Sequence, residues 1–185
     1  IESQGFRGIS CRIHTPQGSF SALIPIPGRH MVYNALAGTA VGLAYGMELS
    51  EIQKGIESLQ SLSGRFHIIE NENYTVVDDC YNANPMSMKA SLGILKDAMG
   101  RKVADMGELG ANEKELHREV GTFAGTCGID LLICVGTLAK EIAEAAKMSS
   151  KAEGKALGIV HFATLEDLLA HLGEQVKQGD TILVK

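Results

Sequence analysis

The sequence predicts an α/β protein whose larger part is a Rossmann-like domain with a mostly parallel sheet. Short apolar segments alternate with helical patterns along residues 66–185, and such alternation favours parallel strands joined by helices. Some of these segments are continuously apolar, as in residues 131–135, which is typical of a strand covered on both faces. The polar, glycine-bearing stretch at residues 61–65 indicates a domain boundary before this part.

The chain begins with a predicted β-hairpin. Two segments of loosely alternating apolar residues lie on either side of the turn signal at residues 16–19, Pro-Gln-Gly-Ser. The two predicted strands are residues 8–15 and 20–26.

Two helices are expected after the hairpin. An alanine-rich stretch, residues 31–45, predicts the first helix, and Gly46 is a plausible stop at its C-terminus. Ser50 and Gln53 have the spacing of a capping box, which predicts a second helix that begins there and ends near Leu62.

Strands and helices are expected to alternate after the boundary. The predicted strands are residues 67–70, 75–79, 101–104, 130–135, 158–162 and 181–185. The predicted helices are residues 87–98, 113–125, 138–148 and 165–175. The strand at 101–104 is short, since strands usually have about five to six residues.

Composition excludes several classes of function. The net charge of −5 and the lack of Lys and Arg clusters argue against a nucleic-acid surface. The four cysteines form no CxxC pair, so we expect neither a metal site nor a disulfide framework. A reducing compartment is expected for the same reason. No apolar run reaches the length of about 18 residues that a membrane helix needs. The GxGxxG and GxxxxGK[ST] loops are also absent, so the main phosphate cradle is not in this chain.

The most informative stretch is residues 76–88. A β-branched strand ends in Asp78 and Asp79, and a polar turn then leads into a helix. Polar groups just past the carboxyl end of a strand lie where open α/β sheets bind ligands, and a helix N-terminus favours phosphate. The alternative is a capped helix after a surface turn, because Asp, Asn and Ser are preferred there for local reasons. The residues alone leave both open.

Four separated motifs carry a resemblance to a known family. They are GRHMVYNALA at 28–37, SGRF at 63–66, DDCYNANPMSM at 78–88 and DMGELG at 105–110. In this order and spacing the chain resembles the Mur ligases. It is most similar to the members that add D-alanyl-D-alanine to UDP-N-acetylmuramoyl-tripeptide in peptidoglycan synthesis.

The resemblance implies a domain assignment. Residues 1–62 would be the last part of a central ATP-binding (ATPase) domain, and residues 63–185 most of the C-terminal Rossmann-like domain. The UDP-sugar domain, the phosphate loop and the magnesium ligands would lie outside this chain. The expected cofactors are ATP and Mg²⁺, and the fragment alone is expected to be inactive.

The resemblance also implies a reaction and its setting. The reaction is ATP-driven amide formation through an acyl phosphate, with UDP-N-acetylmuramoyl-tripeptide and D-Ala-D-Ala as substrates. The full-length enzyme would be a cytoplasmic monomer that binds no nucleic acid and does not insert into a membrane.

Five residues match nucleotide-binding positions of the family or lie beside them. Asn34 would meet the adenine edge, and Asp79 would accept hydrogen bonds from the ribose hydroxyls. Arg65 would contact phosphates when the domains close. His30 would contact the phosphate region or have a helix-cap or structural role. Tyr81 would pack near the nucleotide or at the edge of the core.

Three further residues are candidates for contact with the dipeptide. Asn82 and Asn84 either order the turn or touch the incoming dipeptide. Glu108 either receives the dipeptide ammonium group or is simply solvated.

No metal ligand is expected in this chain. The strand before Asp105 is shorter than in similar sequences, which indicates a deletion or missing residues.

Two alternatives remain from the sequence. One is another Mur-type ligase or a folylpolyglutamate-type ligase, which share the architecture. The other is a non-catalytic Rossmann-like module that binds a nucleotide or a partner. A GxxxxGK[ST] loop upstream of Ile1 would separate them, since a binding module has no need of one.

Overall fold

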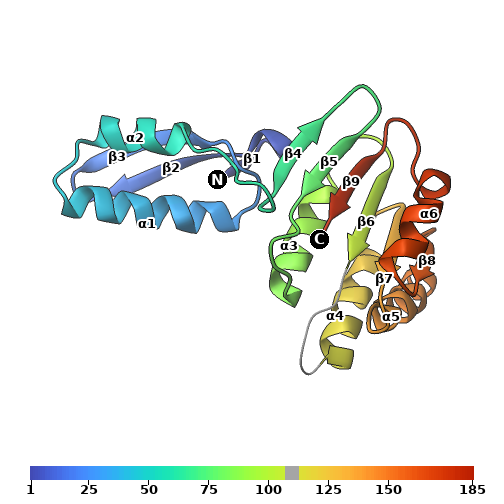
Figure 1. Ribbon diagram of the computed structural model, residues 1–185. Helices are drawn as coiled ribbons and strands as arrows, with labels where there is room; N and C mark the ends of the chain where they lie inside the picture. Colours follow the sequence, from blue (N-terminus) through green and yellow to red (C-terminus); the bar gives the residue numbers. More distant parts are fainter. Residues whose placement is uncertain (107–112) are drawn as a thin grey trace. The chain divides into compact units, whose positions relative to one another are not determined.

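The protein is described from a computed structural model, which describes residues 1–106 and 113–185 (Figure 1). The chain divides into two compact units, Ile1–Ser61 (unit 1) and Leu62–Lys185 (unit 2). No helix in the described part of the chain is both long and apolar enough to cross a bilayer.

Unit 1 contains a three-stranded antiparallel sheet in the order β1-β2-β3. Its strands are β1 (Glu2–Ser3), β2 (Ile9–Thr15) and β3 (Gly18–Ile24), and a short 3₁₀ helix, η1 (Gly5–Arg7), joins the first two. Strands β2 and β3 form the predicted hairpin, whereas β1 was not predicted. A pair of residues carries too little periodicity to be recognised as a strand.

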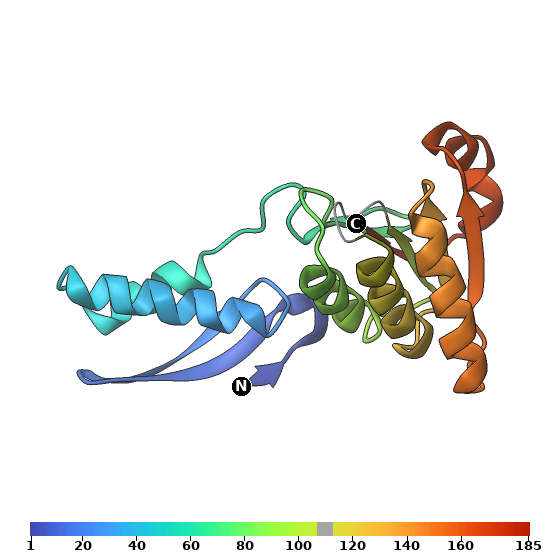
Figure 2. The same cartoon turned by 90° about the horizontal axis from the view of Figure 1, so that it is seen from below.

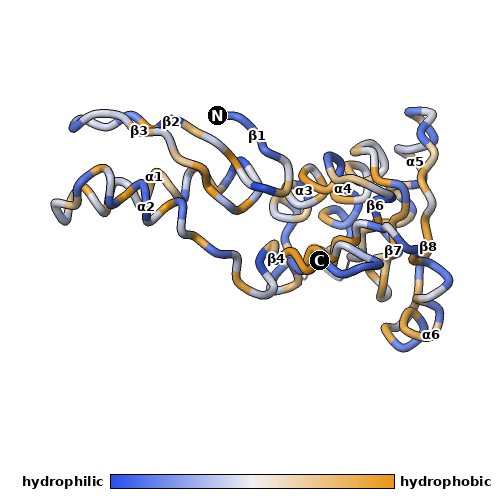
Figure 3. The backbone as a smooth tube through the Cα atoms, turned by 90° about the horizontal axis from the view of Figure 1, so that it is seen from above, coloured by the Kyte–Doolittle hydropathy of each residue, from blue (hydrophilic) through white to orange (hydrophobic). Residues whose placement is uncertain are grey.

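The core of unit 1 lies on one face of the hairpin. Inward-facing residues of β2 and β3 pair directly across the ladder: Ile9 with Ile24, Cys11 with Ala22, and Ile13 with Phe20. Two helices, α1 (His30–Ala44) and α2 (Leu49–Glu57), pack against this face through Val32, Ala35, Ile52 and Ile56. Figure 3 shows the resulting mixture of hydrophobic and hydrophilic positions along the hairpin and the helices.

The predicted cap of α2 was wrong. The helix begins at Leu49, and its N-cap is Glu48, whose backbone is extended. The Glu48 backbone N–H donates to Glu51 Oε2 at 2.9 Å, and the Glu48 side chain accepts from the Glu51 backbone N–H. The capping box is therefore formed by two glutamates. Ser50 is already helical, so the expected Ser50–Gln53 box does not form. The helix also ends earlier than predicted, at Glu57 rather than near Leu62.

Unit 2 contains a six-stranded sheet in the order β4-β5-β9-β6-β7-β8. Its strands are β4 (His67–Glu70), β5 (Thr75–Asp78), β6 (Lys102–Met106), β7 (Leu131–Val135), β8 (Gly158–Phe162) and β9 (Thr181–Val184). Strand β4 is antiparallel to β5, and the other neighbours are parallel. The predicted α/β class and mostly parallel sheet are confirmed. Strand β6 has five residues instead of the shorter strand expected, because its pairing with β7 continues to Met106.

Helices cover both faces of this sheet (Figures 1 and 2). They are α3 (Pro85–Leu95), α4 (Glu113–Thr126), α5 (Ala139–Ala152) and α6 (Leu165–Gln175). The first three lie side by side on one face, and α6 lies on the other. Helix α3 begins two residues earlier than predicted and ends at Leu95, because the Asp97 and Ala98 N–H groups turn back to carbonyls only three residues before them.

The order of the strands explains why α6 lies on a different face of the sheet from the other three helices. From β5 the chain passes over to β6, β7 and β8, and the crossovers carry α3, α4 and α5 on one face. It then returns from β8 to the gap between β5 and β6, and α6 lies on the opposite face. A right-handed crossover requires this change of face when the direction of strand addition reverses.

Strands β6 and β7 are buried on both faces, as their apolar sequences predict. Val103, Leu131 and Ile133 cluster with Leu168 of α6. Their neighbours along the strands, which point to the opposite face, are also fully buried: Ala104, Leu132 and Cys134. Cys134 is therefore a small core residue.

Candidate functional site

The candidate site lies at the carboxyl edge of the unit 2 sheet. The register pairs Asp78 at the end of β5 with Val184 of β9. Asp79 and Lys185, the residues that follow these two strands, are therefore neighbours at the edge of the sheet. The Asp79 backbone N–H continues the ladder by donating to the Val184 carbonyl at 3.0 Å.

Asp79 and Lys185 form a nearly buried ion pair. Lys185 Nζ lies 2.6 Å from Asp79 Oδ2, and the two side chains are 3% and 15% exposed. Lys185 was not among the predicted site residues. A buried ammonium group needs a counter-charge, and Asp79 provides it from a position 106 residues away in the sequence.

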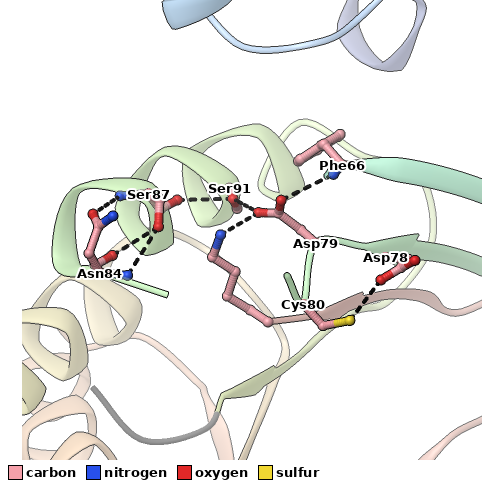
Figure 4. A network of polar contacts seen from close by, with 8 residues as sticks. Phe66, Asp78, Asp79, Cys80, Asn84, Ser87 and Ser91 are labelled. Carbon is pink, nitrogen blue, oxygen red and sulfur yellow. Dashed lines mark hydrogen bonds and ion pairs between the residues drawn. The ribbon is translucent and has the colours of Figure 1, made fainter. Parts of the chain in front are cut away.

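Two further groups donate to the Asp79 carboxylate. The Ser91 hydroxyl of α3 donates to Oδ2 at 2.6 Å, and the Phe66 backbone N–H donates to Oδ1 at 3.1 Å. Figure 4 shows Asp79 between Phe66 and Ser91, with Asp78 turned toward Cys80. One carboxylate thus joins β5, β9, α3 and the segment before β4.

The Asp78 carboxylate holds the segment before β4. Its Oδ2 accepts from the Gly64 backbone N–H at 2.7 Å and from the Ser63 hydroxyl at 3.1 Å. Its Oδ1 accepts from the Cys80 thiol at 3.0 Å. These donors favour the ionised form and hold the pKa of Asp78 below its usual value, with the Cys80 contact as the largest cause.

The same contact changes the chemistry of the thiol. The hydrogen bond to Asp78 is the largest cause that raises the pKa of Cys80, and burial and the nearby negative charge add to it. Cys80 is exposed. Its raised pKa favours the protonated thiol, which is less reactive than the thiolate.

The SGRF segment at residues 63–66 is tied to the turn after β5 at several points. The Tyr81 backbone N–H donates to the Gly64 carbonyl at 3.0 Å. Gly64 has φ +75°, and a Cβ on it would come 3.1 Å from Tyr81 Cβ and 3.3 Å from its backbone nitrogen. Glycine is needed here for both reasons. Phe66 also has a positive φ, 52°, and its side chain is buried.

Arg65 stacks on Tyr81. The guanidinium carbon lies 4.2 Å from the centre of the tyrosine ring, which is a cation–π geometry. Both side chains are exposed, Tyr81 by 69%. The structure therefore brings together Arg65, Asp79 and Tyr81 of the predicted nucleotide-binding residues.

The two asparagines of the turn have different surroundings. Asn84 is the N-cap of α3: its Oδ1 accepts from the Ser87 backbone N–H at 2.9 Å, and Pro85 occupies the first helical position. Asn82 is exposed. Glu108 lies outside the described residues.

The other predicted nucleotide residues lie in unit 1. Asn34 is an exposed residue of α1 and lines an apolar groove of 420 Å³ between α1 and α2, together with Met31, Gly38, Ile52 and Leu59. The Asn34 amide nitrogen donates a weak bond to Met31 Sδ at 3.4 Å. His30 is exposed and is the first residue of α1.

Sequence reasoning missed three polar partners of the aspartates: Ser63, Ser91 and Lys185. Ser91 lies one helical turn from Met88 and from Leu95, which are both apolar and buried, so its place on the inner face of α3 is readable from periodicity. Lys185 offered a weaker signal, as a charge at the end of an apolar strand whose place in the sheet order was unknown.

Comparison with known proteins links this arrangement to one family. Residues 64–185 match the family described as "Mur ligase, glutamate ligase domain". UDP-N-acetylmuramoyl-tripeptide--D-alanyl-D-alanine ligase of Escherichia coli (strain K12) is 36% identical over 184 residues, which cover 96% of this chain and 38% of that protein. The protein of the same name in Bacillus subtilis (strain 168) is 32% identical, with 99% of this chain and 40% of that protein covered.

The fold comparison agrees. A crystal structure of MurF from Acinetobacter baumannii superposes with a TM-score of 0.85 and 32% identity, covering 97% of this chain and 39% of the other. The chain thus spans 38–40% of the length of these relatives.

Proposed function

The chain belongs to the Mur ligase family, and from this we propose that it is part of an ATP-dependent ligase that adds D-Ala-D-Ala to UDP-N-acetylmuramoyl-tripeptide. The main support is the carboxyl-edge cluster, where Arg65 and Asp79 lie at the ligand-binding edge of a parallel sheet. The proposed reaction is the one for which the similar E. coli and B. subtilis proteins are named.

We assign the two units to two domains of that enzyme. Unit 1 corresponds to the last part of the ATP-binding domain and unit 2 to most of the C-terminal domain. The enzyme would act as a cytoplasmic monomer, with Mg²⁺ held by residues outside this chain.

ATP would supply the phosphoryl group that activates the tripeptide carboxylate as an acyl phosphate, which the amine of the dipeptide then attacks. The protein contributes mainly positioning and charge neutralisation to such a reaction. The Arg65 guanidinium, exposed and stacked on a ring by one face, keeps its N–H edges available for phosphate oxygens.

We assign the adenine base to the groove beside Asn34. Its walls are apolar and the amide offers both a donor and an acceptor to the adenine edge. His30, at the start of the same helix, is assigned to the phosphate region. The ribose role of Asp79 requires the hydroxyls to share a carboxylate that already accepts from Phe66, Ser91 and Lys185.

The dipeptide is assigned to the turn after β5. Asn82 is exposed there, and its side-chain amide can donate and accept hydrogen bonds. The Asn84 side-chain oxygen instead accepts from the Ser87 backbone N–H at the start of α3. Glu108 is the proposed partner of the dipeptide ammonium group.

The test is a substitution in the full-length enzyme. Arg65→Ala should lower the rate of D-Ala-D-Ala-dependent ATP hydrolysis at least about tenfold, because one charge-assisted phosphate contact is lost. Arg118→Ala is the matched control: Arg118 is a 61% exposed residue of α4 paired with Glu141, and its loss should change the rate less than about twofold.

Two further outcomes bear on the assignment. This chain alone should form no amide product, and product formation by it would contradict the domain assignment. With UDP-N-acetylmuramoyl-tripeptide as the acceptor, replacing D-Ala-D-Ala by diaminopimelate as the amine should abolish turnover. Joining of diaminopimelate to UDP-N-acetylmuramoyl-L-alanyl-D-glutamate instead would identify a different member of the family.

A further inference from the structure

The contact between Arg65 and Tyr81 joins two exposed side chains that the core does not require. Four other bonds hold the SGRF backbone. They run from Gly64 N–H to Asp78, from Arg65 N–H to the Leu62 carbonyl, from Phe66 N–H to Asp79, and from Tyr81 N–H to the Gly64 carbonyl. These bonds fix where the Arg65 Cα lies, but they leave the direction of its long side chain open.

The tyrosine ring supplies the missing constraint. The Arg65 guanidinium carbon lies 4.2 Å from the ring centre, so the ring covers one face of the cation. Within residues 1–106 and 113–185 the Arg65 side chain makes no hydrogen bond or ion pair. Its in-plane N–H groups therefore have no partner among these residues, and they are the groups that bind phosphate.

We propose that Tyr81 is a positioning residue for Arg65: its ring holds the guanidinium in one direction at the carboxyl edge of the sheet before a phosphate arrives. This inference rests on the proposed phosphate contact of Arg65. Ordering the side chain in advance removes part of the entropy cost of the phosphate contact. Arg65 would make this contact only when the domains close, so its loss should appear in kcat and not in KM for ATP.

The local geometry supports this role. The ring face that Arg65 covers is no longer available to stack on a base. Gly64 lets the two segments approach closely, since any Cβ there would press on Tyr81. The pairing therefore depends on the ring and not on the phenol hydroxyl, which makes Tyr81→Phe a conservative variant.

Steady-state kinetics of the full-length enzyme test the proposal. Tyr81→Leu should lower kcat about three- to fivefold, the loss expected of an exposed cation–π contact, with KM for ATP changed less than about twofold. Tyr81→Phe should keep kcat within about 1.5-fold of the parent, because the ring is retained.

A double-mutant cycle separates positioning from independent action. In the Arg65→Ala background, Tyr81→Leu should have no further effect on kcat, because the residue through which it acts is gone. Additive losses in the double variant, or an equal loss in Tyr81→Phe and Tyr81→Leu, would overturn the positioning role.

Proton NMR of this chain tests the contact without the reaction. The Arg65 side-chain CH₂ resonances should be shifted upfield by the ring in the parent chain and in Tyr81→Phe, and should return to ordinary positions in Tyr81→Leu. Ordinary positions in the parent chain would overturn the proposal. If the ring shift is present but Arg65→Ala keeps full turnover, the proposed function of Arg65 fails, and the positioning role falls with it.

Discussion

Asp78 and Asp79 are consecutive residues whose carboxylates have different surroundings. Asp78 accepts from Ser63, Gly64 and Cys80 on the side of the SGRF segment. The Asp79 side chain points the other way and contacts Lys185, which follows the last strand, and Ser91 of α3. The alternation of side chains at a strand end explains why two adjacent aspartates serve two different connections.

The Asp79–Lys185 pair should dominate the stability of the sheet edge. We expect Asp79→Asn to lower the free energy of unfolding of unit 2 by about 3 kcal/mol, because it leaves a buried ammonium group without its counter-charge. Urea denaturation followed by circular dichroism measures this loss.

Two variants control this measurement. Asp97→Asn, an exposed aspartate after α3, should change the free energy of unfolding by less than about 0.5 kcal/mol. Adding Lys185→Met to Asp79→Asn should restore part of the loss, since it removes the unpaired charge. Equal stability of Asp79→Asn and Asp97→Asn would contradict the buried pair.

The Asp78–Cys80 contact depends on pH in both directions. It needs an ionised carboxylate and a protonated thiol. The lowered pKa of Asp78 contributes stability above its unfolded value, which is lost as the pH falls through the folded value. The raised pKa of Cys80 contributes stability below its unfolded value, which is lost as the pH rises. The contact is therefore fully stabilising between roughly pH 4 and pH 8.5.

Thiol alkylation tests this contact. Asp78→Asn should raise the rate at which iodoacetamide modifies Cys80 at pH 8 by about threefold or more, because the thiolate is no longer opposed by a carboxylate. Ser63→Ala is the matched control, since it removes one bond to Asp78 but keeps its charge, and the rate should not change. A rate unaffected by Asp78→Asn would show that the carboxylate does not control the thiol.

At the scale of elements, helices α4 and α5 approach each other closely. A Cβ on Gly121 would lie 2.3 Å from the Ile142 carbonyl oxygen, and one on Gly125 would lie 2.4 Å from the Ala146 carbonyl oxygen. The two helices thus approach so closely that only glycine fits at these two positions of α4.

Alanine substitutions should therefore have opposite effects in different helices. Gly121→Ala should lower the free energy of unfolding by about 2 kcal/mol, because α4 and α5 are forced apart. Gly173→Ala in α6, where a Cβ meets nothing within 4 Å, should raise it by about 0.5–1 kcal/mol through helix propensity. Thermal unfolding distinguishes them, and a shift of the same sign in both would contradict the close approach.

At the scale of the whole molecule, the two units have separate cores. The core of unit 1 uses residues of the hairpin and its two helices, and that of unit 2 uses residues of β6, β7 and α6 with their neighbours. Each buries its own apolar surface, which is the property of an independent folding unit.

Unit 2 should therefore fold without unit 1. Residues 62–185 expressed alone should unfold cooperatively in urea, and Asp79→Asn should weaken this piece by the same amount as it weakens the whole chain. Circular dichroism and dispersed amide NMR spectra measure this. A piece without cooperative unfolding would show that unit 2 depends on unit 1.

The sequence by itself determined the local structure. The α/β class, the hairpin and the positions of most strands and helices follow from periodicity and turn residues, which act over a few positions. Errors concentrated at helix ends, where Glu48 replaced Ser50 as the α2 cap, because several side chains compete for the same backbone N–H groups. Asp79 and Arg65 were recognised as candidates because their motifs are local.

Only the tertiary structure decided what those candidates touch. The partners of Asp79 come from α3, from the SGRF segment and from Lys185, 106 residues further along the chain. Lys185 reaches it because β9 enters the sheet between β5 and β6. Sheet order depends on pairing between distant segments and on the hand of the crossovers, which no local pattern of residues encodes.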